Sequence, residues 1–397
     1  MTSLSKLRRA RLSVCLEYAA LLHKIPKKER NIIIRKAIAR TELTTKAMEN
    51  LLSFDAKDEK SNKRYTGEIV HMDIREITHR VEKESLTIRQ ITAEIEKIIA
   101  GQTGLLNRML IGLLCGGHLL LEGLPGLAKT TAVKALAATI DTSFKRIQFT
   151  PDLLPADIIG TQIYRPDNGS FEVNKGPIFH NIVLADEINR APAKVQSALL
   201  EAMQERQVTI RDTTFKLDDP FLVLATQNPI EQEGTYPLPE AQVDRFMMKI
   251  KVDYPSAEEE KEIVKRTRAG SSQNISAVVD ISALQSAQEV LQCIHIEERL
   301  VDYIVRLTRA TRNPDEFKLD IGFMISYGVS PRASIWLEAA SRAHAFLNGR
   351  GYVTPQDIKS MTPEVFRHRI LLSYEAEAEG KTTDDIINVL LERVEVP

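Results

Sequence analysis

One short segment, residues 123–130, combines glycines with a lysine and a threonine, and it directly follows an apolar run. Glycines allow backbone N–H groups to turn inward on phosphate oxygens, and a helix that begins there adds its dipole. Lys129 in such a segment reaches the β- and γ-phosphates of a nucleotide, and the Thr130 hydroxyl ligates Mg²⁺. The expected contacts to ATP come from Gly123, Leu124, Pro125, Gly126, Leu127, Ala128, Lys129, Thr130 and Thr131.

One position departs from the usual phosphate-binding pattern, because Ala128 stands where a second glycine is expected. A methyl group at this position tightens the turn into the helix. The segment on its own is also compatible with a glycine-rich turn that binds no ligand. Its interpretation therefore depends on what else the chain offers.

An apolar run that ends in two carboxylates supplies the second group of candidate residues. Residues 182–185 have the pattern of a buried strand, and Asp186 and Glu187 follow it directly. Asp186 is expected to join Thr130 at the Mg²⁺ ion. Glu187 is expected to polarise the attacking water, which hydrolysis of ATP requires and binding alone does not. A solvated strand end is the alternative for this pair taken alone.

A third apolar run, residues 221–225, ends in a polar tip that contains Asn228. If this strand lies between the other two, Asn228 approaches the γ-phosphate and helps to position the water. Taken alone, Asn228 could simply begin a turn before Pro229. The three segments together predict a magnesium-dependent ATPase, with Glu187 and Asn228 among its catalytic residues.

These residues need elements that bring them together, and the chain offers an alternation of short apolar strands and helical stretches from about residue 87 to residue 252. The alternation predicts an α/β fold with a parallel sheet flanked by helices. Turn residues favour two hairpin insertions within it, at 161–173 and 208–217.

We expect three parts in the chain. Residues 1–66 form a basic helical extension with a polar linker, residues 67–254 the nucleotide-binding core, and residues 255–397 an all-helical C-terminal lid domain. Helical periodicity dominates the last part, where Ser256 and Thr354 begin segments with the form of a capping box.

Composition describes an ordinary globular protein, with 43% apolar side chains among 397 residues and a net charge of −1. This charge gives no chain-wide electrostatic reason to expect nucleic acid or membrane as the partner. Cys15, Cys115 and Cys293 stand far apart, so neither a disulfide framework nor a zinc site is expected, and a reducing cytoplasm fits. The apolar run 109–121 is too short and too rich in glycine to span a bilayer.

The first fifty residues are basic, with twelve Lys or Arg against four Glu. Their periodicity predicts helices, and Glu17 and Tyr18 interrupt a run that otherwise resembles a signal peptide. Two interpretations remain open for this segment. It is a small helical module that binds a partner, or it lies outside the native protein, which would then begin at Met72.

Five ordered segments resemble the MoxR family of the AAA+ superfamily. They are GLPGLAKT, LADEINRAP, ATQNP, PLPEAQVDRF and SPRA, at 123–130, 184–192, 225–229, 237–246 and 330–333. The resemblance covers residues 87–393 and implies an AAA+ P-loop fold with sheet order 5-1-4-3-2, flanking helices and a helical lid. It also implies that the two hairpins are the helix-2 insert and the pre-sensor-1 hairpin, and that Gly101 and Gln102 lie against the adenine.

The same resemblance suggests two arginines for the transition state. Arg245 is similar to an arginine finger that acts on ATP bound by the neighbouring subunit, and Arg332 to the sensor-2 arginine of the lid. Arg206 and Arg211 compete with Arg245 for the first role, and a surface or ion-paired arginine is the other possibility. A finger supplied by a neighbour predicts ATPase activity that depends on oligomerisation.

The resemblance further implies a homo-oligomer, expected to be a hexameric ring, with a chaperone-like role in assembling or activating client proteins, sometimes with insertion of a metal cofactor. A partner with a von Willebrand factor A domain is expected beside it. The alternatives are a nucleic-acid motor, an ATPase subunit like that of magnesium chelatase, and an ATP-binding scaffold without turnover. Nucleic acid is disfavoured because the first hairpin, 161–173, carries Arg165 as its one positive charge.

Overall fold

The computed structural model describes residues 74–99, 101–124, 126–167, 169–229, 235–268 and 275–397. These residues belong to one compact unit that begins at residue 73. The expected helical extension, 1–66, and the proposed start at Met72 lie outside the described residues, as does Pro125 of the phosphate-binding segment.

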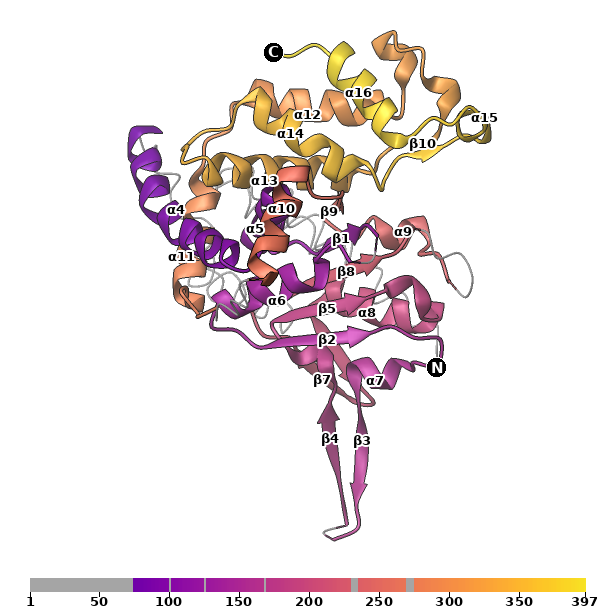
Figure 1. Cartoon of the computed structure of the whole chain (residues 1–397). Helices are drawn as coiled ribbons and strands as arrows, with labels where there is room; N and C mark the ends of the chain where they lie inside the picture. The colour runs from indigo at the N-terminus through magenta and orange to yellow at the C-terminus, as the bar shows by residue number, and fades with distance from the viewer. Residues whose placement is uncertain (1–73, 100, 125, 168, 230–234, 269–274) are drawn as a thin grey trace, which may run out of the picture. The chain divides into compact units, whose positions relative to one another are not determined.

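A five-stranded parallel sheet forms the centre of the core, with the strand order β2-β5-β8-β1-β9 (Figure 1). When these strands are numbered one to five along the chain, the order from the β9 edge is 5-1-4-3-2, as the family resemblance implied. The interior strands β1, β5 and β8 are almost wholly apolar, because helices cover both faces of the sheet. The bounds are β1 Leu119–Glu122, β2 Phe144–Gln148, β5 Ile182–Asp186, β8 Leu222–Gln227 and β9 Met248–Lys251.

The edge strand β2 does not appear among the apolar runs recognised in the sequence. Its sequence FKRIQ is mostly polar, and Ile147 is the one residue of this strand that is fully buried. An edge strand is exposed along one side and needs no apolar run. β2 pairs in parallel with β5, so that Gln148 lies opposite Asp186.

Helices cover both faces of the sheet. α6 packs against β5 on one face and α4 packs on α6, while α7 and α8 lie on the other face. α5 precedes β1 in the chain, and α9 precedes β9. The bounds are α4 Ile74–Glu96, α5 Thr103–Cys115, α6 Lys129–Thr139, α7 Pro155–Ile159, α8 Ala193–Glu205 and α9 Glu240–Val243.

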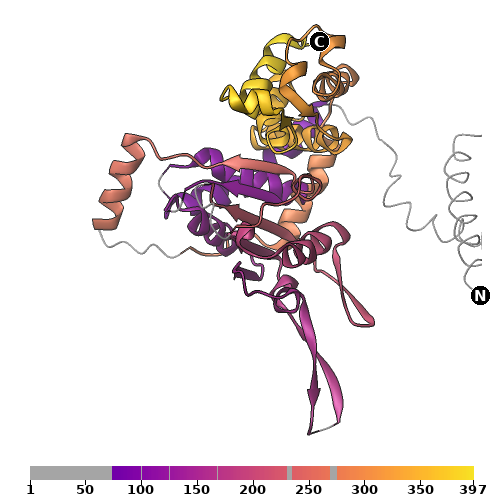
Figure 2. The same ribbon diagram turned by 90° about the vertical axis from the view of Figure 1, so that its right-hand side faces the viewer.

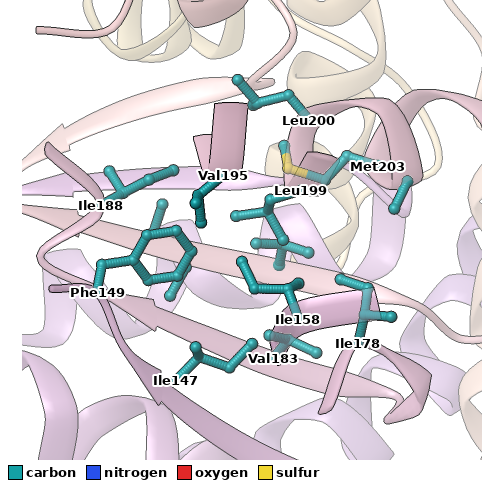
Figure 3. Close-up of a cluster of buried hydrophobic side chains, with 14 of the residues drawn as sticks. Ile147, Phe149, Ile158, Ile178, Val183, Ile188, Val195, Leu199, Leu200 and Met203 are labelled. Carbon is teal, nitrogen blue, oxygen red and sulfur yellow. The ribbon is translucent and has the colours of Figure 1, made fainter. Parts of the chain in front are cut away.

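An apolar cluster fills the space between the sheet and α8 (Figure 3). Val195, Leu199 and Met203 lie at helical spacing on α8 and are buried in the cluster together with Val183 of β5. Phe149, which directly follows β2, is fully buried in the same cluster. Removal of this apolar surface from water holds the strands in place, and with them the strand ends that carry the candidate residues.

Two β-hairpins leave the core on the same side (Figure 2). Both occur where the sequence predicted them, at 161–173 and 208–217. On the first hairpin Tyr164 and Phe171 are exposed and lie against each other across the strands, with ring centroids 5.2 Å apart. The paired strands are β3 Gly160–Arg165 with β4 Ser170–Lys175, and β6 Gln207–Ile210 with β7 Thr213–Lys216.

The described residues from 255 to 397, which the sequence assigned to the lid domain, are helical apart from one small antiparallel pair of strands that was not predicted. Both expected capping boxes form, between Ser256 and Glu259 and between Thr354 and Asp357. Among the described residues, no helix has the length and hydropathy needed to cross a bilayer. The bounds are α10 Ala257–Arg268, α11 Ile281–Cys293, α12 Glu298–Ala310, α13 Pro331–Leu347, α14 Pro355–Phe366, α15 Tyr374–Ala378 and α16 Thr383–Arg393, with β10 Ile325–Tyr327 and β11 Leu371–Leu372.

Candidate functional site

The phosphate-binding segment joins β1 to α6. Gly123 packs against the chain after β9, where a Cβ on it would lie 2.7 Å from the carbonyl oxygen of Val252. Gly126 has a φ of 86°, which favours glycine, and a Cβ on it would meet no atom within 4 Å. The segment is therefore packed against the sheet at its start and open at Gly126. Because α6 begins at Lys129, its first amide groups have no partner within the helix and are available to an anion.

Ala128 adopts a left-handed conformation directly before α6, with φ 57° and ψ 16°. This conformation costs an L-residue roughly 1–2 kcal/mol, which explains why glycine is usual at this position. The tightening of the turn that the sequence predicted therefore takes the form of backbone strain. Ala128 is exposed, so its methyl group is not packed in the interior.

The Lys129 side chain reaches back across the segment. Its Nζ donates a hydrogen bond to the carbonyl oxygen of Gly123. Burial lowers the pKa of Lys129, and the negative charges of Asp186, Glu187 and Glu122 oppose that shift. The ammonium group thus lies within electrostatic reach of three carboxylates at the strand ends.

Asp186 is the last residue of β5 and is only 7% exposed. Thr130 Oγ1 lies 3.4 Å from Asp186 Oδ2, and Thr226 Oγ1 donates to Asp186 Oδ1 at 2.6 Å. Arg146 of β2 pairs with Oδ2 as well, with its Nε at 2.8 Å and its Nη2 at 2.7 Å. The structure therefore brings together the hydroxyl and the carboxylate that the sequence assigned to Mg²⁺, and it adds an arginine to them.

Glu187 follows β5 in a left-handed conformation, with φ 57°. Its backbone N–H donates to Thr226 Oγ1 at 2.8 Å, which fixes this turn. Gln148 Nε2 donates to Glu187 Oε2 at 2.7 Å, and Arg190 Nη1 lies 3.1 Å from the same oxygen. The side chain is nevertheless 29% exposed, so water can reach the carboxylate.

β8 lies between β5 and β1, as the interpretation of Asn228 required. Thr226 near the end of β8 bridges the two carboxylate residues, because its hydroxyl donates to Asp186 and accepts from the Glu187 amide. Asn228 lies two residues further along the same strand end and is 7% exposed. Adjacent parallel strands thus bring their polar tips to one edge of the sheet.

Four residues of this strand-end site were not singled out in the sequence. One of them, Arg190, lies three positions after Glu187. Arg146 and Gln148 belong to β2, whose polar pattern concealed the strand. Thr226 was noticed only as part of a polar tip. The strand register explains its position. Ala225 pairs with Ala185, so Thr226, the next residue of β8, lies at the end of β5 beside Asp186.

Gly101 and Gln102 join α4 to α5 and contact the segment that leads into α10. The Gln102 amide donates to Glu259 Oε1 at 3.2 Å, and its side chain donates to the carbonyl oxygen of Asp253 at 3.1 Å. Gly101 has a φ of 73°, and a Cβ on it would lie 2.1 Å from Glu259 Oε1. The left-handed backbone favours glycine here, and the assignment of this pair to adenine binding stays a prediction.

Arg245 lies after α9, and its Nη1 donates to the carbonyl oxygen of Leu200 on α8 at 2.9 Å. With Gln204 and Gln242 it lines a hollow on the surface formed by α8 and α9. None of the residues given above as neighbours of Lys129, namely Gly123, Glu122, Asp186 and Glu187, takes part in the hydrogen bond from Arg245 to Leu200. Its role as a finger for a neighbouring subunit stays a prediction.

The two arginines that compete with Arg245 have other surroundings. Arg206 ends α8 and donates to the carbonyl oxygens of Phe221 at 2.8 Å and Gly116 at 2.5 Å. These bonds hold the strand ends opposite the site, which favours a structural role. Arg211 lies in the turn of the second hairpin, with φ 53°.

Arg332 lies in the first turn of α13, where its Nη1 is 3.3 Å from Asp244 Oδ2. Ser330 Oγ and Arg369 Nε donate to Asp244 Oδ1, at 2.9 Å and 2.8 Å. Neither Asp244 nor Arg369 was singled out in the sequence, and they lie 125 positions apart. These four side chains form a junction between the core and the lid, and the structure places Arg332 there.

The strand-end site has the groups that a magnesium nucleotide requires. Lys129 offers a positive charge, and the segment beside it is open at Gly126. Thr130 and Asp186 offer the oxygen ligands that Mg²⁺ prefers. A further carboxylate, Glu187, is accessible to water beside them. The residues therefore fit ATP with Mg²⁺.

Two family models match the chain. Residues 118–248 match the ATPase family associated with various cellular activities (AAA), and residues 322–390 match the AAA lid domain. The first match contains the strand-end site, and the second contains Arg332 and Arg369 of the junction.

Relatives with known names cover most of the chain. It is 50% identical over 312 residues to Chaperone MoxR1 of Mycobacterium tuberculosis, which covers 78% of this chain and 82% of that protein. It is 34% identical over 313 residues to Protein MoxR of Paracoccus denitrificans, with 74% of this chain and 91% of that protein covered. A crystal structure from Cytophaga hutchinsonii, of a protein assigned as an ATPase, is similar with a TM-score of 0.76 and 51% identity, and covers 82% of this chain and 99% of that one. The chain therefore belongs to the MoxR family of AAA+ ATPases.

Proposed function

We propose that the chain hydrolyses ATP in the presence of Mg²⁺ at the strand-end site. The observation that carries this proposal is the meeting of the Thr130 hydroxyl with the Asp186 carboxylate at 3.4 Å, directly beside Glu187. Thr130 and Asp186 hold the Mg²⁺ ion. The triphosphate lies on Gly123, Leu124, Pro125, Gly126, Leu127, Ala128, Lys129 and Thr131.

Each side chain of the site has a separate task. An Mg²⁺ ion held by Thr130 and Asp186 would neutralise phosphate charge. Glu187 accepts a proton from the attacking water, and Gln148 and Arg190 orient its carboxylate through one of its oxygens. Asn228 positions the water, and Lys129 balances the negative charge of the γ-phosphate.

Other parts of the chain complete the proposed machinery. Arg245 acts on ATP held by a neighbouring subunit, which is supported by its place on the α8–α9 surface, away from the contacts of its own Lys129. Arg332 contacts the γ-phosphate from the lid, and Gly101 with Gln102 contacts the adenine. The chain would then work as a homo-oligomer, a hexameric ring, in the cytoplasm.

The work that hydrolysis drives is, in this proposal, chaperone-like remodelling of client proteins. The similarity to Chaperone MoxR1 supports it. Assembly of a client, activation through a metal cofactor, and a partner with a von Willebrand factor A domain belong to the same proposal. The first hairpin, with exposed Tyr164 and Phe171, is a candidate for contact with the client.

A nucleic-acid motor is not favoured by the first hairpin. Arg165 pairs with Glu172 at 2.8 Å, and the Nζ of Lys175 lies 4.9 Å from the ring centroid of Phe179. With Asp167 and Glu172 on the same hairpin, residues 160–175 carry no net positive charge. Filter binding of DNA across a salt series should show no steeply salt-dependent complex.

Steady-state release of phosphate from ATP tests the proposed activity. We expect magnesium-dependent turnover by the wild type and background turnover by Lys129→Ala. Lys134→Ala is the matched control, because Lys134 is an exposed lysine on the same helix. Turnover by Lys129→Ala equal to that of the control would contradict the proposal.

Oligomer dependence is measured in the same assay. Turnover per subunit should rise with protein concentration as subunits assemble. An Arg245→Ala protein that assembles and keeps full turnover would remove Arg245 from the finger role while leaving ATP hydrolysis at the strand-end site intact.

A further inference from the structure

Asp244 connects the core to the lid and directly precedes the proposed finger Arg245. Its carboxylate engages side chains from two parts of the lid. Ser330 and Arg332 come from the start of α13, and Arg369 comes from the segment after α14. One carboxylate thus ties the lid to the stretch of chain that carries Arg245.

The two arginines on this carboxylate are held very differently. The Arg369 side chain is 1% exposed and also donates to the backbone carbonyl oxygens of Asp244, Phe246, Met247 and Val365. The Arg332 side chain is 46% exposed, and its contact with Asp244 Oδ2 is the longer one, at 3.3 Å. An ion pair as exposed as that of Arg332 contributes little and separates readily.

The junction holds two positive charges, on Arg332 and Arg369, against the one negative charge of Asp244. The pKa of Arg369 is lowered to about 10, chiefly by burial and in part by the positive charge of Arg332, while Asp244 opposes both effects. The two guanidinium groups therefore repel each other across one carboxylate. If Arg332 leaves, Asp244 keeps Arg369 and Ser330 as partners and is not left as an unpaired charge.

We propose that Asp244 is a positioning residue that holds Arg332 while no γ-phosphate is bound and releases it to the γ-phosphate of ATP. The idea rests on the proposed function, because it requires Arg332 to contact ATP. A terminal phosphate carries more negative charge than a carboxylate and suits the guanidinium donors as well, so it outcompetes Asp244. ADP lacks this group and leaves Arg332 on Asp244.

The junction therefore has two states, which differ in the contact between Arg332 and Asp244 and share the contacts of Arg369. Arg369 keeps the lid attached to the segment 244–247 in both states. The contact between Arg332 and Asp244 is present with ADP and absent with ATP. Arg245 is the next residue, so the exchange takes place one position from the side chain that lies on the surface formed by α8 and α9.

The test compares affinities for two nucleotides. Asp244→Asn keeps the shape of the side chain and an oxygen for Arg369, but it removes the charge that holds Arg332. Equilibrium titration with Mg²⁺ should show the slowly hydrolysed analogue ATPγS binding about two- to fivefold more tightly than to the wild type, with ADP affinity unchanged. A purely structural role of Asp244 would change both affinities in parallel.

Two further variants keep the result interpretable. In an Arg332→Ala background the gain from Asp244→Asn should vanish, as a double-mutant cycle requires of a shared contact. Asp280→Asn is the matched control, because Asp280 caps α11 through the Ala283 amide and should leave the ATPγS to ADP affinity ratio unchanged.

Each outcome decides one claim. An affinity ratio in Asp244→Asn that equals or falls below that of the wild type overturns the proposal, as does a gain that persists without Arg332. A wild type that does not bind ATPγS, or that binds it equally well after Lys129→Ala, refutes the proposed function instead. If Asp244→Asn does not fold, Arg332→Gln supplies the test, because ATPγS affinity should fall in it while ADP affinity stays the same.

Discussion

Asp186 and Asp244 organise two regions of the chain, and each carboxylate is paired with arginine in a different way. Around Asp186 the partners come from the sheet and the helix that follows β1, namely Arg146, Thr226 and Thr130. Around Asp244 they come from the lid. The first region is built on backbone pairing, because β2 and β8 hydrogen-bond to β5 on either side. The second is built on side chains.

This difference separates what must stay fixed from what can move. Parallel register holds Gln148 opposite Asp186 and leaves the strand ends little freedom. The junction instead combines one buried tie, through Arg369, with one exposed contact, through Arg332. Chemistry that needs precise geometry belongs in the first region. A response to the state of the nucleotide belongs in the second.

Glu187→Gln is the sharpest test of the first region. The amide keeps the size of the side chain but cannot accept a proton, so turnover should fall by about 10²- to 10⁴-fold. Affinity for ATP should stay within a few-fold, because the phosphate-binding segment is untouched. Phosphate release and equilibrium nucleotide binding measure the two effects.

The control for this substitution is Glu298→Gln, on the exposed first turn of α12, which should change neither quantity. Loss of nucleotide binding together with turnover would show that Glu187 holds the site together. It would then be no different in kind from Asp244, and the comparison between the two regions would fail.

Arg369→Met tests the permanent tie of the second region. The substitution keeps a long apolar stem in a buried position but leaves Asp244 without its buried partner. We expect a loss of about 3–5 kcal/mol in the free energy of unfolding, as for other broken buried pairs. Denaturant unfolding measures this loss.

Arg393→Met makes the same chemical change on an exposed helix end and should alter stability by less than about 0.5 kcal/mol. A similarly small effect at Arg369 would mean that the junction is not a buried tie. Arg369 would then contribute as little to stability as the exposed Arg332.

The two regions also differ in how far the sequence reveals them. Asp186, Glu187 and Asn228 were predicted because each follows an apolar run, and a parallel sheet brings such ends together. The signal is local and needs no knowledge of the fold. Arg146 escaped because its edge strand lacks an apolar run.

The junction offers no local signal of this kind. Asp244 and Arg369 meet only because the lid folds back onto the chain before β9. Asp244 lies in the family-like segment 237–246, but nothing in that segment indicates a partner 125 positions away. Arg332 was recognised by family resemblance, and its partner was not. Contacts between side chains far apart in the sequence are what pattern analysis cannot supply from one sequence.

Two histidines, the buried His118 of the core and the partly buried His368 near the junction, predict how stability depends on pH. His118 precedes β1, accepts a hydrogen bond from the Val223 amide at 3.0 Å and faces the Met203 carbonyl oxygen at 3.2 Å. Burial lowers its pKa to about 3. His368 contacts the Phe246 carbonyl oxygen at 3.1 Å, and burial lowers its pKa well below the usual value.

Because both folded-state pKa values are depressed, the unfolded chain binds more protons below about pH 6.5. The contribution to stability is complete above that pH and is lost as the pH falls, by about 2 kcal/mol at pH 5 for His118 alone. Unfolding measured from pH 7 to pH 5 should show a flatter dependence in His118→Gln and in His368→Gln. His79→Gln, on the exposed face of α4, should keep the wild-type dependence. If only one of the two substitutions weakens the pH dependence of stability, the other histidine is not kept neutral in the folded protein.

Ala128→Gly tests whether alanine in place of the usual glycine affects stability. Its effect should be the smallest of those predicted here. Glycine relieves the left-handed strain of roughly 1–2 kcal/mol, but it gives back about 0.5–1 kcal/mol in backbone entropy. We expect a net gain in stability of up to about 1.5 kcal/mol. Ala138→Gly, an exposed position inside the same helix, should instead lose about 1 kcal/mol. Opposite signs for the same substitution would confirm the strain at Ala128, whereas a loss at both positions would show that the alanine methyl stabilises the turn and that the fixed region tolerates a non-glycine residue without strain.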